Sequence, residues 1–470
     1  MANSWAGSFG FGYDALSRRT SLTRPNGVNT SYAYDSVSHL LSVLHQAGLN
    51  TLDGASYTYD PAGNRTSKGN FLNGVTSNYG YDPLYELTQV TQGGSTTESY
   101  SYDFVGNRLS SSGVPSYNYN SSNELTSNSN GSYTYDANGN TLSDPAGKSY
   151  SWDFENRLTQ AVNPGVGTTT FRYDPFGRRI QKSGPLGTTN YLYDGMAPGA
   201  NVIEEMDGSG TVLARYTQDV RVDGPLSMLR GGTASYYEQD GVNSVTSLSN
   251  STAGLANSYT FDSFGNLTAS TGTLTNPFRY TGRDFDPETG IYEYRMRYYD
   301  PNVGRFLSED PIGFDGGPDF YVYVRNSPVG LLDPSGLDAL GGDVQALANI
   351  FPGSVPGPNG SLIIPVSCGE ARRILGAQGY QDRNSWGYNG PFSAFWNPWH
   401  HAGGWEWRTF GPGFHFRMQY DPAVSAINPF GKCPDKSCTL DQFHIDPSNP
   451  LEPGQMWPHV KCDFFGWCGK

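Results

Sequence analysis

The chain has 470 residues, of which 36% are hydrophobic and 16% charged, and it carries a net charge of −14. This composition excludes a coiled coil, which needs helices rich in Ala, Glu, Lys and Leu, and 14% aromatic residues argue against simple disorder. No apolar run approaches the length of a membrane span, and residues 1–20 lack the apolar stretch of a signal peptide. An acidic chain also gains no affinity for nucleic acid from its overall field.

From the N-terminus onward, a short motif of the form aromatic-x-aromatic-Asp recurs, followed by a turn and an alternating run. Examples are YTYDPAGNRTS from Tyr57, YSYDFVGNRLSS from Tyr100 and FRYDPFGRRIQK from Phe171. The two aromatic residues share one face of a strand, and Asp-x-x-Gly-Asn is turn chemistry. The pattern predicts a repeat architecture of β-hairpins, with almost no helix before residue 337.

These repeats resemble the YD repeats of RHS proteins, toxin-complex C subunits and teneurins, and residues 279–337 closely resemble the RHS-associated core. The resemblance implies a mostly β fold: hairpins form a spiral sheet that is part of a hollow shell, closed at one end by the core segment. A small α+β domain with a variable toxin activity is then expected at the C-terminus. The expected boundaries are 1–278 for the YD repeats, 279–337 for the core and 338–470 for the toxin domain.

An area estimate bears on whether this shell is complete. At about 16 Å² per strand residue, 337 residues cover at most about 5,400 Å², whereas enclosing a compact domain of 133 residues needs about 6,600 Å². We therefore expect the chain to be the C-terminal portion of a larger cage, or a displaced orphan toxin module.

Two DPxG motifs stand at the end of the core segment, DPIGF from Asp310 and DPSGL from Asp333, and eighteen residues, 315–332, lie between these five-residue stretches. In RHS proteins this arrangement resembles a self-cleaving aspartyl protease, and the implied cut follows Leu337. Two neighbouring carboxyl groups cannot both ionise, so one acts as acid while the other activates water. The resemblance assigns these roles to Asp310 and Asp333, with Arg305 as a weaker candidate for orienting them.

Each of these motifs also has a structural interpretation, because Asp-Pro-x-Gly is common turn chemistry. Asp315 and Asp319 are nearby carboxylates that could be mistaken for the pair. Glu309 precedes Asp310 where some relatives have a basic residue, which leaves open what sets the pKa values of the pair.

Composition changes sharply near Leu337. All five cysteines, five of the seven histidines and seven of the nine tryptophans follow it. One fold rarely segregates residue types in this way, so the remaining residues are predicted to form a separate domain. Helical spacing with a glycine stop marks residues 370–379, and FHFRM at residues 414–418 has the alternation of a strand.

Polar residues of this tail are arranged as general acid–base catalysis requires. Alternation places His415 and Arg417 on one face of a strand, and His444 and Asp446 share a face of another; His459 lies near a third short strand. Histidine pairs cleave RNA without metal, since one deprotonates the 2′-hydroxyl and the other protonates the leaving oxygen. The hypothesis is a ribonuclease-like toxin without a cofactor, in which Arg417 holds the phosphate and Asp446 orients a histidine.

Several alternatives remain open for the tail. The histidines can satisfy internal hydrogen bonds while the tryptophans fill a core. The spacing of Cys433 and Cys438, and of Cys462 and Cys468, is loosely zinc-like, but two disulfides plus a free Cys368 suit an exported protein equally well. A catalytic metal would find its ligands among four histidines: His400, His401, His444 and His459.

The resulting functional prediction is a bacterial polymorphic toxin, secreted or delivered to the cell surface, that releases its C-terminal enzyme by self-cleavage. Its expected partners are a cognate immunity protein, the secretion machinery or the upstream shell, and RNA as substrate. The alternatives are a non-enzymatic cell-surface module that binds carbohydrate or another cell, and a metal-dependent hydrolase toxin.

Overall fold

The computed structural model describes residues 2–3, 7–195, 200–219 and 223–337, and beyond these the backbone of seven short strands between residues 355 and 462. The chain divides into two compact units, Met1–Gly342 and Asp343–Lys470. The described parts are almost entirely β, and their only helical segments are three single 3₁₀ turns. The prediction of a mostly β fold is therefore confirmed.

The first unit begins with a short strand pair, β1 (Ala2–Asn3) with β2 (Gly7–Ser8), and a ten-stranded antiparallel sheet in which every strand pairs with its neighbours in the chain. The strands of this sheet are β3 (Gly10–Tyr13), β4 (Arg19–Thr23), β5 (Val28–Tyr34), β6 (Leu40–Ala47), β7 (Asn50–Tyr59), β8 (Arg65–Asn70), β9 (Thr76–Tyr81), β10 (Leu87–Gln92), β11 (Ser95–Tyr102) and β12 (Arg108–Ser111).

A small sheet and a fourteen-stranded sheet continue the same meander. The small sheet consists of β13 (Tyr117–Tyr119), β14 (Leu125–Asn128) and β15 (Gly131–Ser132). The large sheet consists of β16 (Thr134–Tyr135), β17 (Thr141–Ser143), β18 (Ser149–Trp152), β19 (Leu158–Asn163), β20 (Gly167–Tyr173), β21 (Arg179–Gly184), β22 (Gly187–Tyr193), β23 (Val202–Asp207), β24 (Val212–Gln218), β25 (Pro225–Arg230), β26 (Thr233–Gln239), β27 (Val245–Asn250), β28 (Leu255–Phe261) and β29 (Leu267–Thr271).

The aspartate of each YD motif builds the turn between two strands. In the hairpin of β11 and β12, Asp103 Oδ1 accepts hydrogen bonds from the amides of Val105 and Asn107 at 3.0 and 2.9 Å. Gly106 adopts a φ of +93°, which glycine tolerates best. The ladder register shifts between Ser101 and Tyr102, so a bulge precedes the turn. The same pair of amide contacts recurs at Asp14, Asp35, Asp60, Asp82, Asp136, Asp153, Asp174 and Asp262.

In many of the repeats the second aromatic residue links neighbouring hairpins. The hydroxyl of Tyr102 donates to the carbonyl of Leu87 at 2.9 Å, and Trp152 Nε1 donates to the carbonyl of Thr141 at 2.7 Å. Equivalent bonds to the preceding hairpin are made by Tyr34, Tyr59, Tyr81, Tyr119, Tyr173 and Tyr193. These tyrosines therefore supply directed hydrogen bonds as well as apolar bulk.

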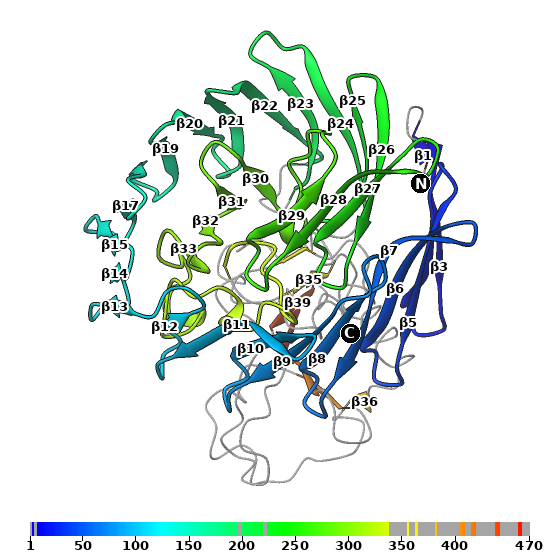
Figure 1. The fold of residues 1–470 in the computed structure, drawn as a ribbon, viewed down its shortest axis with the longest axis horizontal. Coiled ribbons are helices and arrows are strands. Elements are labelled where there is room, and N and C mark those ends of the chain that lie inside the picture. The colour runs from blue at the N-terminus through cyan, green and yellow to red at the C-terminus, as the bar shows by residue number, and fades with distance from the viewer. Residues whose placement is uncertain are drawn as a thin grey trace, which may run out of the picture. The chain divides into compact units, whose positions relative to one another are not determined.

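The two large sheets meet through side chains, with β26 and β27 lying beside β7 (Figure 1). Ion pairs cross this seam: Arg19 contacts Asp219 at 2.6 Å in a buried pair, and the partly exposed Lys68 contacts the buried Asp240 at 2.6 Å. No strand pairing joins the two sheets, so the described strands form a curved, open wall and no closed barrel.

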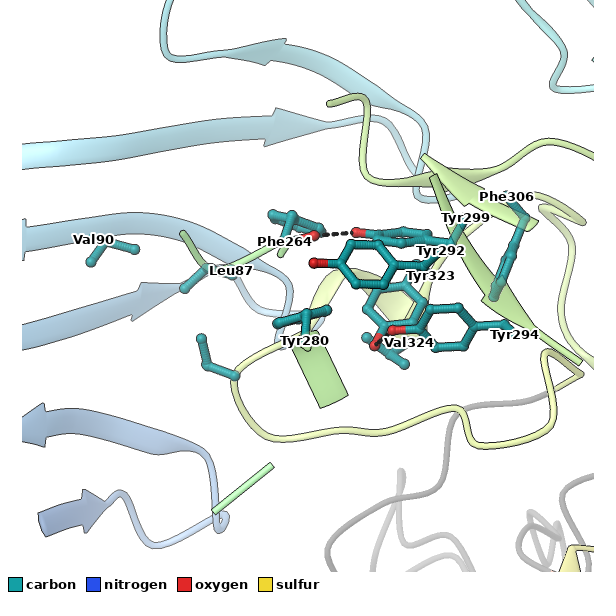
Figure 2. Packing of buried hydrophobic residues seen from close by; sticks show 11 residues of the cluster. Leu87, Val90, Phe264, Tyr280, Tyr292, Tyr294, Tyr299, Phe306, Tyr323 and Val324 are labelled. Carbon is teal, nitrogen blue, oxygen red and sulfur yellow. Dashed lines mark hydrogen bonds between the residues drawn. The ribbon is translucent and has the colours of Figure 1, made fainter. Parts of the chain in front are cut away.

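The core segment lies along this wall and packs around tyrosines. It contains η1 (Tyr280–Gly282), β30 (Asp284–Asp286), β31 (Ile291–Tyr294), β32 (Arg297–Asp300), β33 (Arg305–Phe306), η2 (Gly313–Asp315) and η3 (Val324–Asn326), with β30 to β33 forming a four-stranded antiparallel sheet. Figure 2 shows Tyr294, Tyr299 and Tyr323 packed beside Phe306, all of them buried, and their rings meet in edge-on or tilted contacts. The hydroxyls of Tyr294 and Tyr323 are 3.0 Å apart and bond to each other, so these buried polar atoms are satisfied.

Buried charges attach the core segment to the shell strands. Arg179 in β21 bonds Asp284 at 2.8 Å and also pairs with Asp286, while Lys182 contacts Asp286 at 3.0 Å. Removing one member of such a buried network would leave an uncompensated charge, so these pairs fix where the core segment docks.

The second unit contains one seven-stranded sheet in the described residues, ordered β34-β35-β39-β40-β38-β37-β36. Its strands are β34 (Val355–Pro356), β35 (Leu362–Ile364), β36 (Gln381–Asp382), β37 (Trp405–Arg408), β38 (His415–Gln419), β39 (Cys438–Asp441) and β40 (His459–Cys462). The helix predicted over residues 370–379, on which the α part of the α+β prediction depends, lies outside the described residues.

Candidate active site

The two DPxG motifs come together around one arginine. Arg297, the first residue of β32, places its Nη2 atom 2.9 Å from Asp310 Oδ2 and 3.4 Å from Asp333 Oδ2. One nitrogen atom thus contacts both carboxyl groups, which brings the two aspartates into one site. The three side chains are almost fully buried, with exposed fractions of 2% for Arg297, 7% for Asp310 and 1% for Asp333.

Each aspartate is held by its own turn. Asp310 Oδ1 accepts a hydrogen bond from the amide of Ile312 at 3.0 Å. Asp333 Oδ1 accepts bonds from the amides of Gly336 at 2.7 Å and Leu337 at 3.1 Å. Each carboxyl group therefore has two roles. One of its oxygens accepts the hydrogen bonds of the turn, and the other faces Arg297.

Burial dominates the electrostatics of this pair. Loss of solvent raises the pKa of Asp310 to about 6, against the opposing effect of Arg297, and the neighbouring charge of Asp333 adds to the rise. Burial also raises the pKa of Asp333, against the effects of Arg297 and of the amides of Leu337 and Gly336. One shared cation beside two buried carboxyl groups favours a state in which one of them keeps its proton.

A small pocket opens beside the pair, and Leu337 lines it together with Arg297, Asp310 and Asp333. The residue that would precede the cleaved bond is thus next to both carboxyl groups. Two buried carboxyl groups that share one cation beside a pocket are suited to acid–base chemistry on a group bound in that pocket.

Arg305, the weaker candidate for orienting the two aspartates, has other partners than this pair. Its guanidinium makes two bonds to Asp319, at 2.9 and 3.0 Å, and a third to Asn107 at 3.1 Å. Asp319, one of the carboxylates that could be mistaken for the pair, is therefore neutralised by Arg305. Burial also raises the pKa of Glu309, the residue before Asp310. In the described part of the chain, Glu309 makes no hydrogen bond or ion pair with Arg297.

Arg297 is the site residue that the sequence analysis missed. It belongs to the stretch YEYRMRYYD, in which charged residues interrupt two otherwise aromatic strands. A buried arginine needs an anionic partner, so an arginine within a strand of buried tyrosines was the available signal.

The comparison with known proteins agrees with this architecture. The teneurin YD-shell family matches residues 72–316 of the chain. The chain belongs to this YD-shell family.

Two curated relatives and one solved structure show the extent of the likeness. The tRNA3(Ser)-specific nuclease WapA of Bacillus spizizenii is 36% identical over 312 residues, covering 64% of this chain and 12% of the relative. The double-stranded DNA deaminase toxin A of Burkholderia cenocepacia is 28% identical over 371 residues, covering 69% of the chain and 24% of the relative. The YD-shell chain thus spans a minor part of the length of these proteins.

In the crystal structure of TcdB2-TccC3-Cdc42, one chain aligns over 73% of this chain and 20% of its own length, with a TM-score of 0.59 and 21% identity. This likeness shows a shared fold for the large antiparallel sheets.

Three of the predicted tail residues lie in strands of the second unit. His415 and Arg417 belong to β38, and His459 begins β40; the two strands are parallel neighbours in which Arg417 and His459 are register partners. His444 and Asp446, predicted to share a face, lie outside the described residues, as do His400 and His401. Of the cysteines, Cys438 and Cys462 are register partners in β39 and β40.

Two further observations concern only the described part of this YD-shell chain. None of its groups of histidine, cysteine, aspartate and glutamate has the arrangement of a metal site. None of its helical segments is long and apolar enough to span a membrane.

Proposed function

We propose that this chain is the carrier of a polymorphic toxin that cleaves itself after Leu337 and releases residues 338–470. The observation that carries the proposal is the buried pair of Asp310 and Asp333 around Arg297, with Leu337 lining the same pocket. The names of the relatives, a tRNA nuclease and a DNA deaminase toxin, support a toxin as the released part.

The chemistry uses the two carboxyl groups in different protonation states. Burial raises the pKa of both groups, that of Asp310 to about 6, and in this proposal Asp310 holds the shared proton while Asp333 acts as the base. A water molecule adds to the Leu337 carbonyl carbon, while Asp333 takes one proton from the water and Asp310 gives its proton to the carbonyl oxygen.

The tetrahedral intermediate then breaks the bond to Asp338. Asp333 passes its proton to the departing nitrogen, and Asp310 recovers a proton from the hydroxyl as the carbonyl re-forms. One water molecule is consumed, and the products are a new carboxyl group on Leu337 and a new amino group on Asp338. Arg297 limits the negative charge of the pair throughout, because it contacts both carboxyl groups.

The test is self-cleavage of the full chain, followed on a gel and by mass spectrometry of the fragments. The unsubstituted chain is expected to yield fragments that meet between Leu337 and Asp338, and Asp310→Asn is expected to stay intact. Asp136→Asn is the matched control, since Asp136 makes a similar turn in the shell and lies outside the site. Cleavage of Asp310→Asn at the same bond would overturn the proposal.

A second proposal concerns the released part, which we propose to be a metal-independent ribonuclease. The register pairing of Arg417 with His459 on adjacent strands, with His415 two residues before Arg417, supports a cluster of phosphate-binding and proton-transferring residue types. In this proposal His444 shares the acid–base role and Asp446 orients a histidine. The producing cell then needs a cognate immunity protein.

The ribonuclease proposal predicts that the self-cleaved chain degrades RNA in the presence of a metal chelator. His459→Ala should abolish the degradation, and the matched control His39→Ala, a substitution in a shell turn, should leave it unchanged. An RNA pool that survives the unsubstituted, cleaved chain, or that is degraded only when metal is supplied, would contradict the proposal.

A further inference from the structure

The segment just before the cleaved bond lies against a single hairpin turn. Three consecutive residues, the two of the turn between β31 and β32 and the first of β32, donate hydrogen bonds to three consecutive carbonyl oxygens of the second DPxG motif. The bonds run from Arg295 Nη1 to Pro334, from the amide of Met296 to Ser335 at 3.2 Å, and from Arg297 Nε to Gly336. The segment is therefore recognised by its backbone, in a fixed register with the turn.

Gly336 shows how closely the two backbones approach. A Cβ atom at this position would collide with the carbonyl oxygen of Tyr294 and would lie 3.1 Å from the amide of Arg297. Gly336 also has a φ of +72°, a conformation that glycine adopts without strain. The close fit requires glycine here for two independent reasons, and both place the segment against the hairpin turn.

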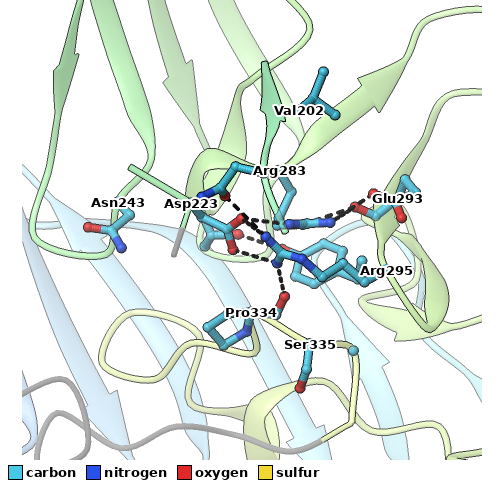
Figure 3. Close-up of polar contacts among 12 residues, drawn as sticks. Val202, Asp223, Asn243, Arg283, Glu293, Arg295, Pro334 and Ser335 are labelled. Carbon is cyan, nitrogen blue, oxygen red and sulfur yellow. Dashed lines mark hydrogen bonds and ion pairs between the residues drawn. The ribbon is translucent and has the colours of Figure 1, made fainter. Parts of the chain in front are cut away.

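The side chain of Arg295 is also held by a part of the shell that is distant in the sequence. Asp223, which precedes β25, contacts Arg295 Nη2 at 2.8 Å and Nη1 at 3.2 Å (Figure 3). The same carboxylate contacts Arg283 at 2.6 Å, and Arg283 contacts Glu293 at 2.8 Å. The side chains of Asp223 and Arg283 are more than nine-tenths buried, so water screens the attraction between their charges only weakly.

We propose that Asp223 and Arg295 form a positioning pair for self-cleavage, which holds residues 334–336 in register so that Leu337 stays beside the two aspartates. The inference rests on the proposed self-cleavage and adds to it a recognition site for the peptide backbone before the cut. Arg297 contacts the reacting carboxyl groups, whereas Arg295 acts through Pro334 and touches neither of them. Side-chain identity at residues 334 and 335 matters less to this site than the presence of carbonyl oxygens in register.

The expected effect of losing this pair is a slower reaction with unchanged chemistry. A small displacement of a reacting group costs about a hundredfold in rate, and the dyad itself remains intact. We therefore expect Arg295→Ala to slow self-cleavage by about ten- to a hundredfold. The cleavage rate of Arg295→Ala should depend on pH as that of the unsubstituted chain does, because the protonation states of Asp310 and Asp333 still determine the rate.

The experiment follows cleavage of the full chain over time for Arg295→Ala, Arg295→Lys and Asp223→Asn. Arg215→Ala is the matched control, since Arg215 makes a half-exposed ion pair with Glu204 on β24 and β23. Added methylguanidinium should restore part of the rate to Arg295→Ala, which a purely structural defect would not allow. Arg295→Lys is expected to retain an intermediate rate, because lysine keeps the charge but not the paired geometry.

Two outcomes separate this inference from the proposed function. If Asp310→Asn stays intact while folded Arg295→Ala and Asp223→Asn cleave at the unsubstituted rate, the positioning pair is wrong and the aspartate dyad stands. If Asp310→Asn itself cleaves, the proposed function falls. Should Arg295→Ala fail to fold, as seen by loss of the near-ultraviolet tyrosine signal, Arg295→Lys and Asp223→Asn carry the test.

Discussion

Aspartates build turns in both the repeat region and the core segment, yet the pKa values of two repeat aspartates shift in the opposite direction from those of the core pair. At Asp153 and Asp174, burial alone would raise the pKa, but hydrogen bonds from Arg157 and Arg178 outweigh it and lower the pKa. At Asp310 and Asp333, the same competition ends the other way, and burial raises the pKa of both.

The two kinds of aspartate differ in how deeply the side chain is buried and in how many carboxyl groups share one arginine. The Asp153 side chain is 19% exposed and has Arg157 four residues along the same turn. Asp333 is 1% exposed, and it shares Arg297 with Asp310. A turn aspartate with its own cation is stabilised as an anion, whereas two buried carboxyl groups around one cation favour retaining a proton. The same local turn chemistry thus serves structure in one region and supplies acid–base groups in the other.

The largest test of this comparison removes the cation from each region. Arg297→Ala leaves two buried carboxyl groups without their shared cation, so we expect loss of self-cleavage and a fall of about 3–5 kcal/mol in the free energy of unfolding. Arg18→Ala, which removes the partner of the partly exposed Asp14, should cost about 1 kcal/mol or less and leave cleavage unchanged. Urea denaturation and a cleavage gel measure both. Equal effects of the two substitutions would erase the distinction.

Much of the fold follows from the repeat motif. The aromatic pair on one strand face and the Asp-x-x-Gly turn predict each hairpin, and the hairpins are confirmed. The acceptor of each tyrosine hydroxyl could not be predicted, because it lies in the neighbouring hairpin. The seam was also beyond prediction, since Asp219 is 200 residues from its partner Arg19.

The sequence predicted the two aspartates of the candidate site but not its arginine. The paired motifs marked Asp310 and Asp333, but Arg305 was closer in the chain than Arg297 and equally basic. The decision between the two arginines depends on a strand register, in which Tyr294 pairs with Arg297 and Asp300 pairs with Arg305. Spacing alone does not contain that register, because it arises only when the core segment folds against the shell.

The next prediction uses pH to separate the two kinds of aspartate. Because the pKa of Asp310 is about 6, its acidic form is lost as pH rises through that value, and self-cleavage should slow about tenfold per pH unit above it. Acidification should slow cleavage as well once Asp333 is protonated, which gives a bell-shaped profile. Cleavage rates after refolding from urea into buffers of increasing pH measure this. A rate that stays constant from acidic to mildly alkaline pH would refute the acid role of Asp310.

The smallest expected effect comes from an aspartate of the repeat region. In a double-mutant cycle of Asp174→Asn and Arg178→Gln, made in the non-cleaving Asp310→Asn chain, we expect a coupling of about 0.5–1 kcal/mol at neutral pH. The pKa of Asp174 is lowered in the folded state from its ordinary 3.8, so this stability is present above the unfolded pKa and is lost as pH falls through the folded one. Urea denaturation at several pH values measures the coupling. A coupling that grows on acidification would mean that Asp174 titrates as Asp310 does, and the contrast between the two regions would fail.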